Sequence, residues 1–426
     1  MTIDETHLEP QLAGSDFALD TQTASASDVV RNYLQRFRRG GDLGLAPAVM
    51  ALVALTAVFG ILRPESFPSK FNFGNYFTQA APICVLAMGV TFVLLLGEID
   101  LGAGYTAGVC AAVVATGLKN DLPLPISLLF SFAAAAAMGA FVGWLVAKIG
   151  IPSFVVTLST FLSWQGVLLL LTKEGGTIRI ENSVVNAIEN KNMAVWVGWA
   201  LFAIVVGGYT LGAASRAVRR SRQGLVGEPL AVVAGKAALI TIVWGVATWI
   251  LNSPRGANGL RGVPVVVPVV LVLAVTLTFV LDRTAWGRHL YAVGGNAEAA
   301  RRAGINVSRV KMSAFLVSAM LASIAGIVLA SRLNSVDPQT GGNDTLLIAV
   351  GAAVIGGTSL FGGRGRIVNA VLGGLVFALI NNGLPLLRKI GPVDFSDAGP
   401  KFIVNGLVLL LFASIDALSR RRASAS

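Results

Sequence analysis

Two carboxylates, Glu98 and Asp100, follow directly on a long apolar run and lie in the glycine-flanked stretch GEIDLGAG at 97–104. A carboxylate at the edge of an apolar segment is costly unless it is paired or hydrated. Such a pair can line a polar pathway, couple a conformational change to an ion, or anchor the end of a helix. Asp100 immediately precedes the next apolar run, where a negative charge stabilises a helix N-terminus, so the sequence favours the anchoring role.

Uncharged polar residues inside apolar runs form a second set of candidates. A path for a small solute rich in hydroxyl groups needs such donors and acceptors, often beside an aromatic ring. The alternative for each residue is a hydrogen bond between neighbouring helices, worth about 1 kcal/mol. The residues retained for a solute pathway, beside the two carboxylates, are Thr157, Trp164, Gln165, Asn381 and Asn382.

The sequence does not support catalysis by this chain. It contains two histidines and two cysteines, both cysteines lying inside apolar runs, so neither a nucleophilic triad nor a metal site is expected. The phosphate-binding order G-x-x-x-x-G-K-[ST] is absent, and the glycine-rich stretch GGTSLFGGRGR at 356–366 is better explained as a turn. We therefore expect no metal ion, no cofactor and no ATP hydrolysis by the chain itself.

A short basic run, Gly294–Asn306, separates two long apolar segments. Asn296 suits a helix N-cap, Glu298 lies in the first turn, and Gly304 suits a left-handed stop after the last turn. These features predict a helix of about two turns, which is too short to be stable alone in water and must dock on another surface. The side chains suited to that contact are small or charged, namely Glu298, Ala299, Ala300, Arg301, Arg302 and Ala303.

The composition indicates the class of protein in which these stretches lie. The chain of 426 residues is 54% hydrophobic and only 13% charged, and apolar runs long enough to cross a bilayer recur along it. We predict an all-α polytopic membrane protein with about 12 transmembrane helices, made of about ten core spans and an extra pair. The predicted spans cover about residues 45–62, 77–97, 102–118, 124–148, 154–172, 195–214, 237–252, 264–281, 312–331, 345–361 (or a re-entrant segment there), 367–384 and 401–418.

The positive charges set the orientation of these spans. The net charge is +11, but the basic residues sit in short loops between apolar runs, which is the positive-inside pattern and not a nucleic-acid surface. Both termini are then cytoplasmic. The residues that this orientation assigns to the cytoplasmic side include Arg216, Arg219, Lys236, Arg283, Arg288, Arg301, Arg302, Arg309 and Lys311.

Three regions follow from this pattern. Residues 1–44 are expected to form a cytoplasmic tail, acidic at first and ending in a basic helix at the membrane interface over Val29–Arg39. Residues 45–418 form the transmembrane domain, which contains the short helix within 294–306. Residues 419–426 form a second cytoplasmic tail.

An internal repeat could relate spans 2–5 to spans 9–12. The fifth span opens with PSFVVTL from Pro152, and the twelfth opens with PKFIVNG from Pro400. These two starts lie on opposite sides of the membrane in the predicted topology, as an inverted repeat requires.

Three motifs together resemble one family of membrane proteins. The string GGNAEAARRAGIN at 294–306 resembles the coupling motif of ABC importer permeases, particularly those for ribose, xylose, arabinose and galactosides. The stretch 97–104 is similar to the G-x-I-D-L-S-x-G pattern of those monosaccharide permeases, except that Gly102 replaces the usual Ser. The stretch 356–363 resembles their G-G-x-S-L-x-G-G pattern, and the extra pair of spans resembles the xylose-type branch.

This resemblance implies a function and partners. The chain would be the permease subunit of an ATP-driven importer in the bacterial inner membrane, with D-xylose as the first candidate substrate and ribose, arabinose and galactose next. It would work as a homodimer with a cytoplasmic ATPase subunit, which binds the ATP, and a periplasmic sugar-binding protein. Coupling to the ATPase would fall on Asn296, Glu298, Ala299, Ala300, Arg301 and Gly304.

Three other functions stay open at this stage, and one of them is a membrane scaffold or receptor that transports nothing. A branched-chain amino-acid permease of the ABC class would share the general architecture. An ion-coupled secondary transporter would need an ionisable group inside the membrane, and only Glu98 and Asp100 could serve.

Overall fold

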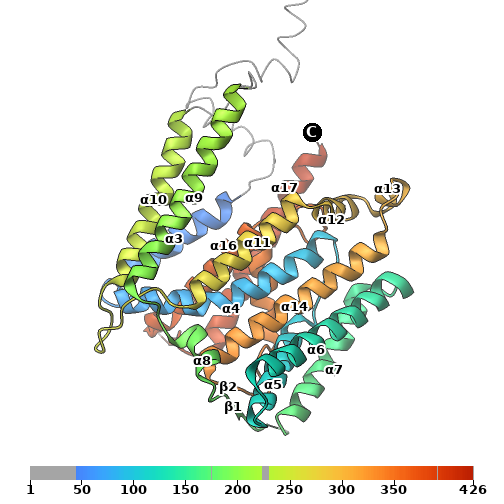
Figure 1. Cartoon of the computed structure of the whole chain (residues 1–426), viewed down its shortest axis with the longest axis horizontal. Helices are drawn as coiled ribbons and strands as arrows, with labels where there is room; N and C mark the ends of the chain where they lie inside the picture. The colour runs from blue at the N-terminus through green and yellow to red at the C-terminus, as the bar shows by residue number, and fades with distance from the viewer. Residues whose placement is uncertain (1–44, 174, 223–229, 391, 426) are drawn as a thin grey trace, which may run out of the picture.

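A computed structural model describes residues 45–173, 175–222, 230–390 and 392–425 of the chain, and Figure 1 shows their mainly helical arrangement. A helix occupies each of the predicted apolar segments. These helices are α3 (Ala46–Leu62), α4 (Lys70–Leu95), α5 (Ala103–Lys119), α6 (Leu124–Trp144) with the π-helical turn η3 (Leu145–Ile149), α7 (Ser153–Leu171), α9 (Val195–Arg222), α10 (Leu230–Asn252), α11 (Val266–Arg283), α14 (Val307–Leu333), α15 (Asn343–Ile355), α16 (Ile367–Leu387) and α17 (Ala398–Ala425).

Smaller elements connect these helices. Three short helices lie between the long ones. The antiparallel pair β1–β2 joins the loops after α7 and α14, and the antiparallel pair β3–β4 lies within the loop between α16 and α17. The elements are α8 (Ser183–Asn190), α12 (Ala285–Gly295), α13 (Ala297–Arg302), β1 (Ile178–Arg179), β2 (Ser335–Val336), β3 (Lys389–Ile390) and β4 (Val393–Asp394).

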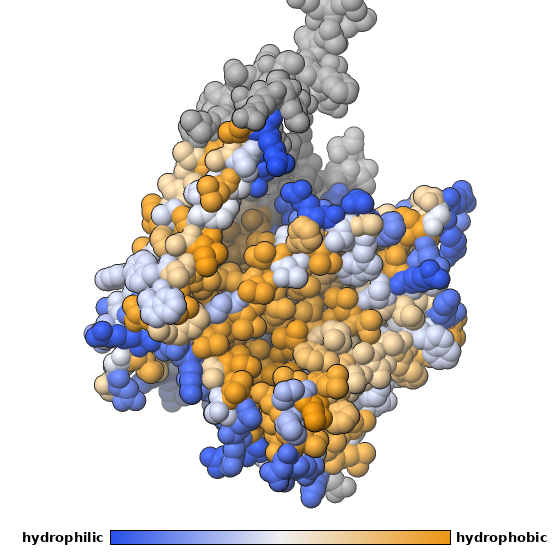
Figure 2. All heavy atoms as spheres, in the orientation of Figure 1, coloured by the Kyte–Doolittle hydropathy of each residue, from blue (hydrophilic) through white to orange (hydrophobic). Residues whose placement is uncertain are grey.

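Eight of the described helices are long and apolar enough to cross a bilayer, namely α4, α6 with η3, α7, α9, α10, α11, α14 and α16. Shorter apolar helices follow at Ala46–Leu62, Asp344–Ile355 and Ala398–Ser414. Figure 2 shows an apolar band across the molecule, with hydrophilic residues gathered toward its ends. The all-α, multi-span class is therefore confirmed, while the number of crossings stays a prediction.

Helix α15 is shorter than its predicted span of 345–361. Its 13 residues rise about 20 Å, less than the roughly 30 Å of a hydrocarbon core. The helix ends at Ile355 because glycines follow it, and Gly357 adopts a positive φ of 93°. The start of α15 nevertheless lies near Leu333 at one end of α14, while the loop after it contacts Leu95 near the other end, so a crossing fits the contacts better than the re-entrant alternative.

Helices α4 and α14 form the centre of the molecule. The apolar windows of these two helices are 83% and 61% buried, whereas those of the hairpin α9–α10 are 11% and 6% buried. The predicted extra pair thus lies at the side of the core, beside α3 and α4 in Figure 1, and packs mainly on itself. The packing of the core is reciprocal, since α4 contacts α15 and α16 while α14 contacts α5 and α6.

The two predicted tails lie at the ends of the chain. The N-terminal tail and its interfacial helix at Val29–Arg39 lie outside the described residues. At the other end, α17 continues to Ala425, so helix extends through most of the stretch 419–426 assigned to a tail.

Helix α12 was missed by the sequence analysis. It begins at Thr284, whose side-chain oxygen accepts a hydrogen bond from the backbone nitrogen of Gly287.

Candidate coupling helix and candidate solute pathway

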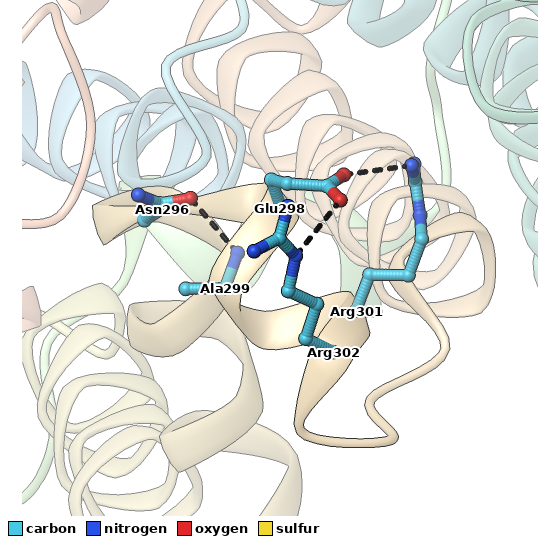
Figure 3. A network of polar contacts seen from close by, with 5 residues as sticks. All are labelled: Asn296, Glu298, Ala299, Arg301 and Arg302. Atoms are coloured by element: carbon cyan, nitrogen blue, oxygen red, sulfur yellow. Dashed lines mark hydrogen bonds and ion pairs between the residues drawn. The ribbon is translucent and has the colours of Figure 1, made fainter.

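The predicted short helix exists as α13, and both of its ends form as the sequence indicated. The side-chain oxygen of Asn296 accepts a hydrogen bond of 2.9 Å from the backbone nitrogen of Ala299, as Figure 3 shows. After the last turn, Gly304 takes a φ of +83°, which side chains other than glycine rarely adopt. The helix has six residues, so its stability must come from its attachments.

The charged residues of α13 contact one another. The carboxylate of Glu298 pairs with Arg301 at 3.1 Å and with Arg302 at 3.3 Å (Figure 3), and all three side chains are more than half exposed. Exposed pairs of this spacing stabilise a helix by only a few tenths of a kcal/mol. Their exposure leaves them available to a partner as a preformed mixed-charge surface.

The alanines of α13 lie on two different faces of the helix, one buried and one exposed. Ala300 is 4% exposed and belongs to the apolar core of the chain itself, whereas Ala299 is exposed. Ala300 therefore contacts the chain itself, and its role in coupling to an ATPase stays a prediction. Its small side chain lets α13 lie against the rest of the chain, and Ala297, three residues earlier on the same face of the helix, is partly buried against the same core.

Helix α13 is held in place through α12. A Cβ atom at Gly294 would lie 1.8 Å from the carbonyl oxygen of Leu95, at the end of α4. The loop 356–366 lies at the same point, since the backbone nitrogen of Gly363 donates to Leu95 at 2.8 Å and the hydroxyl of Tyr291 donates to the carbonyl of Gly365 at 2.7 Å. A displacement of α13 would therefore be transmitted to α4 and to this loop.

The two carboxylates after α4 have separate partners. Glu98 forms an ion pair with Lys311 of α14, and both side chains are largely shielded from solvent. Asp100 is 6% exposed and accepts hydrogen bonds from the backbone nitrogen of Gly102 at 3.0 Å and from the hydroxyl of Ser318 at 3.3 Å. Both groups thus tie the α4–α5 connection to α14, which fits the anchoring role.

Thr157 belongs to the same connection. Its hydroxyl donates to the carbonyl oxygen of Ile99 at 3.0 Å, and its side chain is fully buried. Gly102, found where the resembling family usually has Ser, lies close by, and a Cβ atom there would come within 3.0 Å of the hydroxyl of Thr160. Thr157 therefore acts as a structural hydrogen-bond donor in this structure.

We predict that Lys311→Ala destabilises the protein by about 1–3 kcal/mol, because it leaves the shielded carboxylate of Glu98 without its cation. Replacing both partners by glutamine should restore most of the loss. Thermal unfolding of the detergent-solubilised protein measures both effects. Equal losses for the single and the double variant would show that the ion pair is not the source of the stability.

A cavity with both polar and apolar lining residues lies at the opposite end of α14 from α13. Since α14 has 27 residues, its ends are separated by about 40 Å. The cavity has a volume of about 900 Å³ and is lined by α5, α7, α14, α15, α16, α17 and the loop after β2. Its polar lining residues are Tyr105, Gln165, Asp337, Gln339, Thr340, Asp344, Thr345 and Asn405.

A second cavity of about 370 Å³ shares Asp344, Ile348, Phe402 and Asn405 with the first. Asn381 lines this second cavity. The two predicted pathway residues Gln165 and Asn381 are therefore brought to one connected region, although they come from α7 and α16. This region can accept a small polar solute, because hydroxyl, amide and carboxylate groups line it among apolar side chains.

The remaining pathway candidates lie elsewhere. Trp164 and Asn382 line neither of these two cavities, and each has a buried polar atom without a hydrogen-bond partner in the described part of the chain. Glu98, Asp100 and Thr157 are likewise outside them.

Asn405 is the principal residue that the sequence analysis missed. Its side-chain nitrogen donates to Asn381 at 3.1 Å, while its side-chain oxygen is buried without a described partner and the residue lines both cavities. A polar residue inside the last apolar run was a usable signal. Asp344 and Tyr105 carried no such signal, because only the fold brings them together.

The comparison with known proteins places the chain in a family. The family described as the permease component of branched-chain amino acid transport systems matches residues 72–413. The chain belongs to this permease family. The match covers the helices from α4 to most of α17, so both the cavities and α13 lie within the permease region.

Several curated permeases are similar over almost their whole length. The xylose transport system permease protein XylH of Escherichia coli is 33% identical, over 88% of this chain and 92% of that protein. The ribose import permease protein RbsC of E. coli is 30% identical over 87% and 92%. The autoinducer 2 import system permease protein LsrC of an Enterobacter species is 33% identical over 87% of both chains. No solved structure matches this permease significantly.

These findings confirm the resemblance on which the sequence analysis relied. The relatives are permease components of import and transport systems, and the apolar helices fit a multi-pass membrane protein.

Proposed function

We propose that this permease is the membrane subunit of an ABC importer that carries a monosaccharide, D-xylose before other sugars, across the bacterial inner membrane. The observation that carries the proposal is the 33% identity to a xylose transport system permease over 88% of the chain. The cavity region supports it, because amide, hydroxyl and carboxylate groups suit a ligand that presents hydroxyl groups on all sides.

Each of the two partners would bind at its own end of the permease. A periplasmic sugar-binding protein would deliver its ligand at the cavity end, and a cytoplasmic ATPase subunit would dock on α13. Only four residues separate α13 from α14, and α14 continues to Leu329 and Leu333 at the cavity. Movement of α13 as the ATPases close would therefore rock α14 and change access to the cavity, which is alternating access.

Replacement of Asn405 tests the assignment of the cavity. Asn405→Ala should lower binding-protein-dependent xylose uptake into proteoliposomes by about tenfold, because a buried amide that orients the sugar is lost. Asn75→Ala, an exposed asparagine of α4 away from the cavities, is the matched control and should transport normally. Normal uptake by Asn405→Ala, with normal assembly, would refute the assignment.

Two competing functions make different predictions. A branched-chain amino-acid importer would be driven by a binding protein loaded with leucine, isoleucine or valine and not with a sugar. An ion-coupled transporter would move solute in vesicles that lack the ATPase. The carboxylates named for ion coupling from the sequence lie outside the two cavities, since Glu98 is paired with Lys311 and Asp100 accepts two hydrogen bonds.

The orientation is part of the proposal. Cysteines introduced by Ser25→Cys and Ser424→Cys should resist a membrane-impermeant thiol reagent in intact cells, whereas Glu181→Cys, on the cavity side, should be labelled. The native Cys84 and Cys110 are buried and should give little background. Labelling of both termini from outside would reverse the topology.

The architecture proposed here has twelve crossings and an inverted repeat. The reciprocal packing of α4 on α15–α16 and of α14 on α5–α6 supports the repeat, because two copies that exchange neighbours produce that pattern. The permease would act as a homodimer carrying two ATPase subunits. Large apolar side chains exposed on α7 and α17 supply surface for lipid or for a second copy.

A further inference from the structure

A third cavity lies at the α13 end of the permease and is not used by the proposed transport path. It has a volume of about 490 Å³ and is formed by the end of α11, by α12, by the loop 356–366 and by the start of α16. Three arginines line it, Arg288, Arg364 and Arg366, against one carboxylate, Asp282. The cavity therefore has an excess of positive charge.

Asp282 balances only part of the charge of these arginines, and all three arginine side chains are exposed. Within the described part of the chain, no carboxylate lies within ion-pair distance of Arg288, Arg364 or Arg366. Arg288 makes one long hydrogen bond of 3.5 Å, to the carbonyl oxygen of Arg283. Guanidinium groups without a partner around a hollow are suited to binding a phosphate group.

A buried polar side chain at the floor of the cavity also lacks a hydrogen-bond partner. Asn369 lines it and is only 4% exposed, yet its side-chain oxygen has no hydrogen-bond partner in the described residues. A side-chain amide can present either its oxygen or its nitrogen after a flip, so it can contact a phosphate oxygen or a hydroxyl beside it. A buried side-chain oxygen normally has a hydrogen-bond partner, which a water molecule or a bound group would supply here.

The loop that carries two of the arginines is held in a fixed shape. The backbone nitrogen of Ser359 donates to the carbonyl of Arg364 at 2.8 Å, and Tyr291 holds the carbonyl of Gly365. The loop is thus anchored on both sides of Arg364. The backbone that carries Arg364 and Arg366 is therefore already ordered before a ligand binds, which lowers the entropic cost of binding.

The membrane-facing side of α11 leads to this cavity. Val272, Val275 and Phe279 are each more than 60% exposed, and their spacing places them on one face of α11 with Asp282 at its end. The span itself ends at Arg283, so the cavity lies at the edge of the apolar surface. An acyl chain lying on this face would bring its phosphate to the arginines.

We propose that the cavity of Arg288, Arg364, Arg366 and Asn369 binds a phosphate group, supplied by an anionic phospholipid of the leaflet on the α13 side. The glycine-rich stretch 356–366 then contributes arginine side chains to anion binding, without a nucleotide-binding loop. Free phosphate offers the same chemistry, but it would make no use of the apolar face of α11. The site does not depend on which solute the permease carries.

The test uses the full-length permease in mixed micelles containing phosphatidylglycerol or phosphatidylcholine. Native mass spectrometry counts the lipids retained, and titration with inorganic phosphate provides the second arm. Wild type should retain phosphatidylglycerol preferentially. Arg364→Gln combined with Arg366→Gln should lower that retention by about an order of magnitude, because each arginine near a surface contributes several-fold. Asp282→Asn should raise it roughly threefold by removing the opposing charge.

A matched control separates a built site from general surface charge. Arg219→Gln combined with Arg309→Gln removes the same charge from the same end of the molecule but not from the cavity, and should retain phosphatidylglycerol like wild type. Equal loss in this control, or no preference in wild type, overturns the proposal. The permease could instead bind inorganic phosphate, lose this binding when Arg364 and Arg366 are replaced, and show no preference between the lipids. That result would support a phosphate site but reject a lipid as the source of the phosphate. If the wild type binds neither phosphate nor lipid and the variant with Arg364 and Arg366 replaced no longer pulls down the ATPase, the arginines serve protein docking and the proposal is overturned.

Discussion

Gly294→Ala is expected to destabilise the permease by more than about 2 kcal/mol and to prevent transport, although alanine normally strengthens a helix. The added Cβ atom would lie 1.8 Å from the carbonyl oxygen of Leu95 and 3.0 Å from the backbone nitrogen of Gly363. Both neighbours are backbone atoms, which cannot move aside as a flexible side chain can. Helix α12 would have to lift off the end of α4, and α13 would move with it.

Gly295→Ala is the matched control for this change. Gly295 is the next residue of α12, and a Cβ atom there meets nothing within 4 Å. This variant should be neutral or stabilise the helix by up to about 1 kcal/mol. Thermal unfolding in detergent and ATP-dependent uptake by proteoliposomes compare the two. Similar behaviour of both variants would show that the contact between α12 and α4 does not set the position of α13.

The features that the sequence predicted well are local ones. Each apolar run became a helix, because length and composition fix that outcome without knowledge of neighbours. Both ends of α13 were predicted for the same reason, since the N-cap at Asn296 and the left-handed turn at Gly304 depend on adjacent residues only. The family followed from motifs of similarly short range.

The features that the sequence could not predict depend on contacts between distant residues. Asp100 and Ser318 are separated by 218 positions, and Tyr105, Asp344 and Asn405 meet in one cavity from three helices. In the sequence, a polar residue within an apolar run looks the same whether it binds a solute or forms a hydrogen bond that stabilises the fold. Only the fold shows that Thr157 donates a hydrogen bond to the backbone of Ile99, whereas Gln165 lines a cavity.

The charge of Glu298 should be decisive for recruitment of the ATPase subunit. Glu298→Lys replaces the carboxylate that bridges Arg301 and Arg302 by a third positive charge, which converts a mixed surface into a purely basic one. We expect pull-down of the ATPase and sugar-stimulated ATP hydrolysis to fall by at least about tenfold, less so at high salt, because the mismatch is electrostatic. Glu65→Lys, an exposed reversal away from α13, should leave both unchanged.

Gly304→Val tests the shape of the same helix separately from its charge. Nothing lies within 4 Å of a Cβ atom at Gly304, so the substitution causes no clash, but a φ of +83° would cost a β-branched residue about 1 kcal/mol or more. The end of α13 should unwind, and coupling should fall while membrane insertion and sugar binding by the periplasmic component stay normal. Gly304→Asn should retain most coupling, since asparagine tolerates this conformation. Full recruitment and full sugar-stimulated hydrolysis by both Glu298→Lys and Gly304→Val would mean that α13 is not the helix through which the ATPase drives transport.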